Sequence, residues 1–362
     1  MRDAHLQLDF RIQRWIFNQG WSGLREVQAK AVAPILSGKT DVLISAATAA
    51  GKTEAFFLPA CSALVKSDDG QNVGGYEKEG QGNGVSILYI SPLKALINDQ
   101  YRRLESLAGL LDMQVTPWHG DSPQSKKNKQ KKSPSGIILI TPESLESLLI
   151  RDAGWVKQAF SSLKYIVIDE FHAFLGSERG QHLLSLLTRL EHVTERLNSP
   201  IPRVALSATL GDLKSVPQSL RPNQSLSCVI IKDDEAKASI KVQVKGYIEP
   251  SQLALELGSK KNNIASFDSQ NIGIQYPYIA EAQVCSDLYR LCRGGSHLIF
   301  ANSRRRTEMI ATELSDLCDY NIVPNEFFPH HGSLSKELRE SLETRLQKEA
   351  LPTTAVCTMT LE

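Results

Sequence analysis

Short apolar segments alternate with longer segments of helical periodicity through the first half of the chain. The short runs are continuously apolar and end at turn or polar residues, whereas apolar residues recur with helical spacing between them. This alternation predicts an α/β fold with a parallel sheet that helices cover on both faces. The strand candidates are Asp41–Ser45, Ser86–Ser91, Gly136–Thr141, Tyr165–Asp169 and Arg203–Ser207.

A second domain is expected after a change of pattern near Lys232, where a polar and irregular stretch begins and extends through Asn271. Further strand candidates follow at His297–Ala301, Asn321–Pro324 and Thr354–Thr358. A chain of 362 residues with 41% hydrophobic residues is long and apolar enough for two cores. We therefore predict one domain over residues 1–232 and a second over residues 233–362.

Two segments interrupt the alternation, and we interpret both as surface insertions. Lys66–Gly84 is rich in Gly, Asp and Asn, and Gln124–Ser135 contains a run of lysines. The lysine run could grip phosphates, but a solvated mobile loop is the commoner outcome for such a segment. Its lysines are Lys126, Lys127, Lys129, Lys131 and Lys132.

Composition narrows the class of protein only slightly. The 41 basic and 40 acidic residues nearly cancel, so a nucleic-acid site would have to be a local patch. The six cysteines form no CxxC pair, which argues against structural zinc and disulfides. No segment reaches the roughly 18 apolar residues of a membrane span. We expect a cytoplasmic protein that does not contact the membrane.

Residues 46–53, Ala-Ala-Thr-Ala-Ala-Gly-Lys-Thr, follow the first strand candidate with the spacing of a phosphate loop. Such a loop directs backbone amides at a phosphate, while Lys52 neutralises the β and γ phosphates and Thr53 ligates magnesium. Gly-Lys-Thr alone also fits a chance turn. We predict that ATP is bound by Thr48, Ala49, Ala50, Gly51, Lys52 and Thr53.

The fourth strand candidate runs directly into Asp169-Glu170-Phe171-His172. Adjacent carboxylates at the end of a buried strand are costly unless a cation neutralises them. A Mg²⁺ site gives each a role: Asp169 holds the metal and Glu170 orients and activates the attacking water. A helix cap or an ion pair is the alternative. We include His172 among the candidate catalytic residues.

With these motifs in this order, the sequence resembles superfamily 2 DExH helicases, and among them the Lhr-like group. Gln28 is similar to the adenine-reading glutamine of that family, and Arg179-Gly180 with Leu183–Leu190 repeats the Lhr-like helix pattern. Ser207-Ala208-Thr209 resembles the motif that couples hydrolysis to domain movement.

The resemblance also identifies candidate nucleic-acid contacts in both domains. Ser91 and Thr141 could simply cap helices. The two roles are compatible, because the free backbone amides at a helix start can also bind phosphates. The candidates are Ser91, Pro92, Lys94, His119, Gly120, Thr141, Asn302, Ser303, Arg304 and Thr358.

The resemblance implies two RecA-like domains in tandem that use Mg²⁺-ATP to move along nucleic acid. It favours DNA over RNA, a single-stranded or partly duplex substrate, and 3′ to 5′ movement. The family's arginine-finger motif is not in the printed sequence, so we expect an incomplete second domain and weak hydrolysis. The alternative is a nucleotide-responsive scaffold, with protein partners, in a DNA repair or anti-phage complex. A kinase or small-molecule ATPase leaves the strand-contact motifs unexplained.

Overall fold

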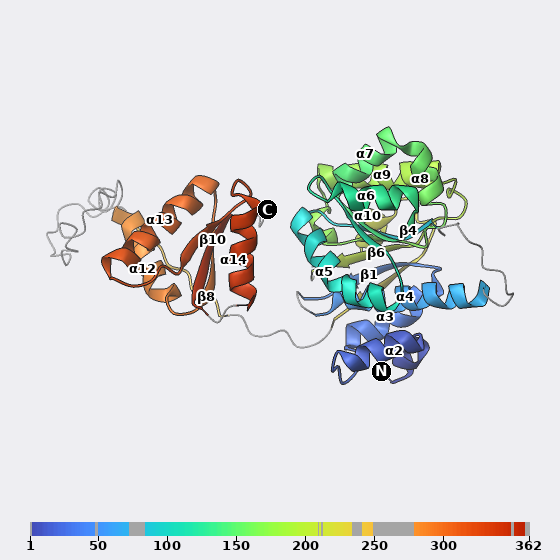
Figure 1. The fold of residues 1–362 in the computed structure, drawn as a ribbon, viewed down its shortest axis with the longest axis horizontal. Coiled ribbons are helices and arrows are strands. Elements are labelled where there is room, and N and C mark those ends of the chain that lie inside the picture. The colour runs from blue at the N-terminus through green and yellow to red at the C-terminus, as the bar shows by residue number, and fades with distance from the viewer. Residues whose placement is uncertain are drawn as a thin grey trace. The chain divides into compact units, whose positions relative to one another are not determined.

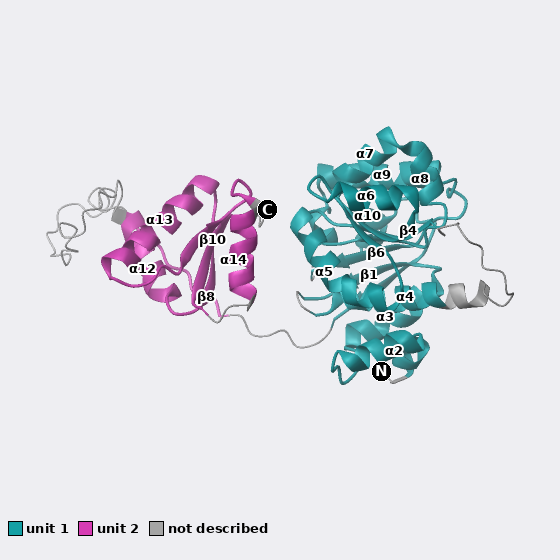
Figure 2. Cartoon of the chain, viewed as in Figure 1, with its two compact units in different colours: residues 1–236 teal, residues 237–362 magenta. Residues whose placement is uncertain are grey.

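The computed structural model describes residues 2–47, 50–71, 84–208, 210, 213–233, 241–248, 279–348 and 351–358. The chain folds into two compact units, residues 1–236 and 237–362 (Figures 1 and 2). The expected boundary at residues 232 and 233 lies just before this division. Each unit is a parallel sheet with helices, so the predicted α/β class is confirmed.

Unit 1 contains a seven-stranded sheet in the order β3-β4-β2-β5-β6-β1-β7, and every neighbouring pair is parallel. The five predicted strands are all present. Two more, β3 and β7, were not predicted, because both are short edge strands, and β3 contains Pro117, which cannot donate to a strand ladder. The strands are β1 (Asp41–Ser45), β2 (Gly84–Ile90), β3 (Val115–Trp118), β4 (Ser135–Ile140), β5 (Tyr165–Ile168), β6 (Arg203–Ser207) and β7 (Cys228–Lys232).

Helices cover both faces of this sheet, as the alternation predicted. Alternate residues of each central strand point to opposite faces, so Val42 and Ile44 join one core cluster while Leu43 joins the other. Helices α3, α4 and α5 pack on the first face, and α7, α8, α9 and α10 on the second. The helices of unit 1 are α1 (Arg2–Gln7), α2 (Phe10–Asn18), α3 (Glu26–Ser37), α4 (Lys52–Gln71), α5 (Lys94–Leu110), α6 (Gln124–Lys132), α7 (Pro142–Arg151), α8 (Ala153–Ala159), α9 (Glu178–Val193) and α10 (Val216–Leu220), with a 3-10 turn η1 (Phe171–Ala173).

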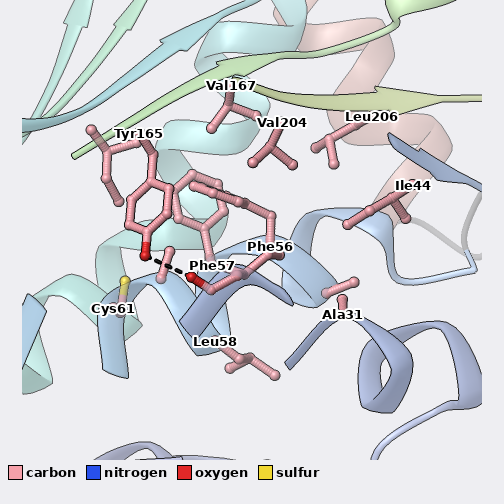
Figure 3. Packing of buried hydrophobic residues seen from close by; sticks show 14 of the residues in the cluster. Ala31, Ile44, Phe56, Phe57, Leu58, Cys61, Tyr165, Val167, Val204 and Leu206 are labelled. Atoms are coloured by element: carbon pink, nitrogen blue, oxygen red, sulfur yellow. Dashed lines mark hydrogen bonds between the residues drawn. The ribbon is translucent and has the colours of Figure 1, made fainter. Parts of the chain in front are cut away.

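The first core fixes α4 against the sheet (Figure 3). Phe56 and Phe57 of α4 are fully buried, and their rings pack edge-on to each other with centroids 4.9 Å apart. Phe56 also packs against Tyr165 of β5, whose hydroxyl donates a 2.8 Å hydrogen bond to the Ile35 carbonyl oxygen of α3. This packing holds the amino terminus of α4, with Lys52 at its start, at a defined place on the sheet.

One of the two predicted insertions differs from expectation, and the other lies largely outside the described residues. Gln124–Lys132 is helix α6, which connects β3 to β4, so the interpretation of this segment as a loop was wrong. Its buried Gln130 donates a 2.8 Å hydrogen bond to the Ser135 carbonyl oxygen, which anchors the helix despite its polar sequence. Residues 66–71 continue α4, and residues 72–83 lie outside the described residues.

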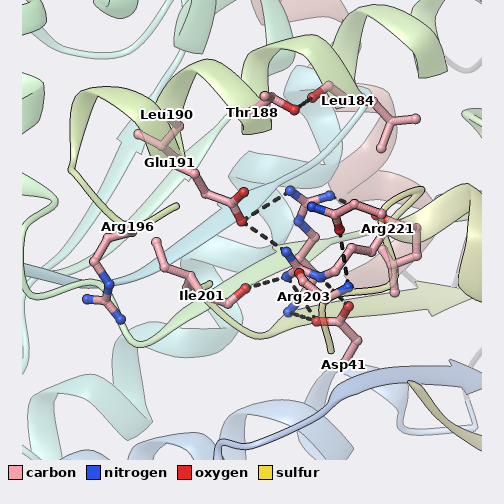
Figure 4. Close-up of polar contacts among 12 residues, drawn as sticks. Asp41, Leu184, Thr188, Leu190, Glu191, Arg196, Ile201, Arg203 and Arg221 are labelled. Carbon is pink, nitrogen blue, oxygen red and sulfur yellow. Dashed lines mark hydrogen bonds and ion pairs between the residues drawn. The ribbon is translucent and has the colours of Figure 1, made fainter. Parts of the chain in front are cut away.

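Four charged side chains are buried together at the amino ends of β1 and β6 (Figure 4). Arg221 contacts Asp41 through Nε at 2.6 Å and Glu191 through Nη1 at 3.2 Å. Arg203 contacts Glu191 through Nη2 at 3.1 Å, and its backbone N–H donates to Asp41 at 2.8 Å. Each buried charge therefore has a partner of opposite sign.

Unit 2 contains a three-stranded parallel sheet in the order β8-β10-β9. The predicted strand at Asn321–Pro324 was wrong, because Ile322 has a φ of +55° and this segment turns out of the preceding helix. The third strand lies a few residues later. The elements are α12 (Ile279–Cys292), β8 (Ser296–Ala301), α13 (Arg304–Tyr320), β9 (Phe327–His330), α14 (Lys336–Lys348) and β10 (Thr353–Thr358). None of the helices described in either unit combines the length and apolarity of a membrane span.

Candidate active site and nucleic-acid interface

The predicted site residues of unit 1 follow the carboxyl ends of the strands, and they divide into two groups along the sheet. The nucleotide motifs follow β1, β5 and β6, which are neighbours in the order β5-β6-β1. The strand-contact motifs follow β2, β3 and β4, which are neighbours in the order β3-β4-β2. Because β2 pairs with β5, the two groups adjoin on one edge of one sheet.

The phosphate loop contacts its own Lys52 side chain and the Gln28 side chain of α3. The Lys52 ammonium donates to the carbonyl oxygens of Ala46 and Ala47 at 3.0 and 3.1 Å. Gly51 has a φ of +86°, and a Cβ there would lie 2.6 Å from the amide nitrogen of Gln28. The positive φ favours glycine at this position, and the Gln28 side chain lies against the loop. Ala50 is half-buried, whereas Thr48 and Ala49 lie outside the described residues.

Thr53 has a partner that the sequence did not indicate. Its buried hydroxyl accepts a 3.2 Å hydrogen bond from the side-chain amide of Gln100 on α5. The carbonyl oxygen of the same Gln100 side chain is buried without a hydrogen-bond partner among the described residues. The two residues lie 47 positions apart on different helices, so no local spacing could have revealed the contact.

Asp169 is buried, and burial raises its pKa to about 6. The charge of Glu170 also raises the pKa, whereas the Tyr89 hydroxyl, the Glu170 backbone amide and the Lys52 ammonium lower it. Asp169 makes no ion pair with the described residues. Glu170 adopts a left-handed backbone with a φ of +47°, and its N–H donates to Asp169 Oδ1 at 3.0 Å. Such strain in a residue other than glycine is typical of functional sites.

His172 joins the carboxylate motif to the motif at the end of β6. Its Nδ1 lies 3.2 Å from Glu170 Oε2, 3.4 Å from the Ser207 hydroxyl and 3.4 Å from the Ala208 backbone N. One ring nitrogen cannot donate to Glu170 and accept from Ala208 at once, so the tautomer of His172 selects between these contacts. Thr209, the last residue of that motif, lies outside the described residues.

A magnesium ion fits this end of the sheet. A buried carboxylate with a raised pKa favours a bound cation, and the Thr53 hydroxyl and the unpartnered Gln100 carbonyl oxygen are neutral oxygen groups of the kind that Mg²⁺ and its waters contact.

The strand-contact half differs from expectation at Ser91. Helix α5 begins at Lys94 with Leu93 as its N-cap, so Ser91 does not cap it. The Ser91 hydroxyl is instead buried without a hydrogen-bond partner among the described residues, and Pro92 beside it is also buried. Thr141 does cap α7, because its hydroxyl accepts a hydrogen bond from the Ser144 N–H at 3.4 Å.

The third strand-contact loop is bound to its neighbours by polar contacts. His119 is buried, and its Nε2 lies 3.0 Å from the Asn98 side-chain oxygen. Lys94 forms an ion pair with Asp121 at 3.1 Å, and the Lys94 ammonium lies close to Gly120. The ammonium of Lys127 on α6 donates to the His119 carbonyl oxygen at 2.7 Å. The structure therefore brings Lys94, His119 and Gly120 together.

In unit 2, the four predicted contact residues also follow carboxyl strand ends. Thr358 ends β10 and pairs with Ala301, the last residue of β8, which places it beside the exposed Asn302. The Ser303 hydroxyl caps α13 by accepting from the Arg306 N–H at 3.2 Å, and Arg304 is exposed on the first turn of that helix.

Comparison with known proteins agrees with this arrangement. The Lhr-Core helicase of Methanothermobacter thermautotrophicus is 29% identical over 364 residues, covering 96% of this chain and 38% of that protein. The Lhr helicase/uracil glycosylase of Escherichia coli is 28% identical, covering 90% of this chain and 23% of that protein. The chain thus spans less than half the length of these relatives.

A solved structure and a family model extend the comparison. The structure of Mycobacterium smegmatis helicase Lhr bound to ssDNA and AMP-PNP matches with a TM-score of 0.74 at 26% identity, covering 98% of this chain and 42% of that chain. The model of the DEAD/DEAH box helicase family matches residues 25–216, which is more than half of the chain. The chain therefore belongs to the DEAD/DEAH box helicase family, and its predicted resemblance to the Lhr-like group is confirmed.

Proposed function

We propose that the chain is the motor part of an ATP-dependent helicase or translocase that moves along single-stranded nucleic acid. The observation that carries this proposal is the division of one sheet edge into a nucleotide half and an adjoining strand-contact half. A kinase or small-molecule ATPase needs only the first half. A motor needs both, because hydrolysis must change the grip on the strand.

In the nucleotide half, we assign roles from the contacts described above. Lys52 exchanges its two loop carbonyls for the β and γ phosphates of ATP, because the phosphates offer stronger charge-assisted contacts. Thr53 and Asp169 would hold Mg²⁺, which supplies neutralising charge to the phosphates. Glu170 orients the attacking water and accepts its proton, and its side chain is partly exposed, with an exposed fraction of 31%.

We propose that His172 carries the state of the nucleotide site to the end of β6. When Glu170 takes up a proton, its attraction for a donated Nδ1 hydrogen weakens. The neutral tautomer that accepts from the Ala208 N–H then becomes favourable. The Ser207-Ala208 segment would in this way respond to hydrolysis.

For the nucleic acid, we propose single-stranded or partly duplex DNA in preference to RNA, with 3′ to 5′ movement. Support for DNA comes from the M. smegmatis relative, whose structure contains ssDNA. The contacts proposed in unit 1 include the exposed Lys94 and the start of α7 after Thr141, which can bind phosphates without reading bases. Binding should therefore be sensitive to salt and largely independent of sequence.

The test is ATP hydrolysis by the 362-residue chain with and without single-stranded DNA, compared with Glu170→Gln. The proposal expects DNA to stimulate hydrolysis. It expects Glu170→Gln to keep both ligands but to lose about 10²-fold or more in rate, because only the water-activating charge is removed. Equal rates for the two proteins would refute the assignment of Glu170. Binding of both ligands with a weak hydrolysis rate that DNA does not raise would instead support a nucleotide-responsive scaffold.

A further inference from the structure

Arg179, on the first turn of α9, joins two of the proposed strand-contact loops. Its Nε and Nη2 donate to Glu143 Oε1 at 3.1 and 2.7 Å, and Nη2 also donates to the Pro92 carbonyl oxygen at 2.8 Å. Glu143 lies on the first turn of α7, directly after the Thr141 loop. Pro92 lies in the loop between β2 and α5. One side chain therefore ties the loop after β2 to the loop after β4.

The same end of α9 packs on the turn that follows the carboxylate motif. The Arg179 guanidinium carbon lies 5.8 Å from the centroid of the buried Phe174 ring. A Cβ on Gly180 would lie 1.9 Å from the Phe174 carbonyl oxygen, so only glycine permits this approach. Phe174 directly follows η1, which begins after Glu170. The start of α9 is thus fixed to the segment that carries Glu170.

We propose that Arg179 is a positioning residue that holds the two strand-contact loops in a defined geometry relative to the hydrolysis site. This inference rests on the proposed function, because the loops that Arg179 positions are proposed to bind a single strand. The planar guanidinium donates in fixed directions to Glu143 and to Pro92, which the single ammonium of a lysine cannot reproduce. The ion pair is largely solvated, with exposed fractions of 39% for Arg179 and 58% for Glu143, so it contributes little to stability.

Two charge-controlled variants separate positioning from simple electrostatics. Arg179→Lys keeps the positive charge but loses the fixed fork. Glu143→Gln removes a negative charge, which by electrostatics alone should strengthen binding to a polyanion. If the Arg179 contact positions the loops, both variants weaken the binding of a fluorescein-labelled oligothymidylate by about five- to tenfold. The double variant should bind no more weakly than the weaker single variant, because both substitutions weaken the same contact.

The matched control is Arg189→Lys on the same helix, since Arg189 makes no hydrogen bond or ion pair within the described chain. We would measure the DNA dissociation constant, the affinity for a fluorescent ATP analogue and the thermal midpoint of each protein. The inference expects nucleotide affinity and midpoint to stay near the parent values in Arg179→Lys and Glu143→Gln. The control should match the parent in all three.

The outcomes separate this inference from the function on which it rests. The positioning role alone is overturned if the parent binds the oligonucleotide and Arg179→Lys binds it equally well. Tighter binding by Glu143→Gln would also overturn it. Parallel losses of DNA affinity, nucleotide affinity and midpoint also overturn it, because they indicate a general structural role. A parent chain that does not bind the oligonucleotide overturns the proposed function, and the inference with it.

Discussion

The two edges of the larger sheet both bury carboxylates, but they treat them in opposite ways. At the amino edge, Asp41 and Glu191 are neutralised by Arg203 and Arg221 (Figure 4). At the carboxyl edge, Asp169 is buried without an ion pair among the described side chains, and its pKa is raised to about 6. The first arrangement is satisfied by the protein itself, whereas the second gains from an added cation.

This difference explains which buried charges stabilise the fold and which serve a ligand. A satisfied network costs little to keep once it is built, but removing one member leaves the others buried and unpaired. An unneutralised carboxylate costs stability in the free protein, and that cost is recovered when a cation binds. The raised pKa of Asp169, rather than burial alone, therefore distinguishes the candidate site.

Removing a charged partner at the amino edge should lower the stability of the protein more than any other substitution considered. Arg221→Ala leaves Asp41 buried without its main cationic partner, so we expect a loss of about 3–5 kcal/mol in the free energy of unfolding. Urea denaturation measures this loss. The control is Arg196→Ala, because Arg196 is partly exposed and donates only to backbone carbonyls. That variant should stay within about 0.5 kcal/mol of the parent. A loss below about 1 kcal/mol for Arg221→Ala would contradict the contrast between the edges.

At the carboxyl edge, the corresponding substitution should stabilise the protein. Asp169→Asn removes the buried charge but keeps an acceptor for the Glu170 N–H, so we expect a gain of about 1–3 kcal/mol at pH 7 without nucleotide or Mg²⁺. Thermal and urea denaturation measure the gain. Asp152→Asn is the control, because Asp152 is partly exposed and paired with Lys131. A destabilised Asp169→Asn would show that the carboxylate is structural.

The same gain should depend on pH. The unfolded Asp169 titrates near about 4 and the folded one at about 6, so the folded state binds more protons between these values. Stability of the parent from this group therefore falls as pH rises through that window. The stability difference between Asp169→Asn and the parent should be full above about pH 6 and vanish below about pH 4. A difference that does not change with pH would exclude a raised pKa as its cause.

The smallest expected change is in nucleic-acid affinity, and it compares lysines of α6 with Lys94. Lys129 lies beside Gln114, Ser135 and Gly136 at the amino edge, whereas Lys94 lies at the carboxyl edge. Lys94→Ala should weaken DNA binding by about three- to tenfold and reduce the salt slope by about one. Lys129→Ala combined with Lys132→Ala should change binding less than about threefold. A larger loss of affinity in the α6 variant than in Lys94→Ala would indicate that the nucleic acid binds to α6.

Sequence patterns predicted the features that depend on local chemistry. The continuous apolar runs of the central strands and the polar residues at their carboxyl ends required no knowledge of long-range contacts. Pro117 interrupts the short strand β3 and hid it from the sequence pattern, and the lysine run hid helix α6, which one buried glutamine anchors. In unit 2, a short apolar segment around Ile322 imitated a strand although its backbone turns.

Contacts between distant segments could not be predicted in this way. The hydrogen bond from Gln100 to Thr53 and the link from Arg179 to Pro92 join residues on separate elements, and neither residue type is unusual in its local sequence. The pairing of Asp41 with Arg221 spans 180 positions. Only the folded sheet brings these residues together, and only then does the contrast between its two edges become visible.

A nucleotide titration can show whether the carboxyl edge of the larger sheet binds Mg²⁺-ATP, as we propose. We would measure the affinity of the 362-residue chain for a non-hydrolysable ATP analogue with and without Mg²⁺, together with Lys52→Ala and, as control, Lys39→Ala on the exposed turn before β1. We predict Mg²⁺-dependent binding that Lys52→Ala weakens at least about tenfold and Lys39→Ala leaves unchanged. Binding by Lys52→Ala that equals the parent would contradict this prediction.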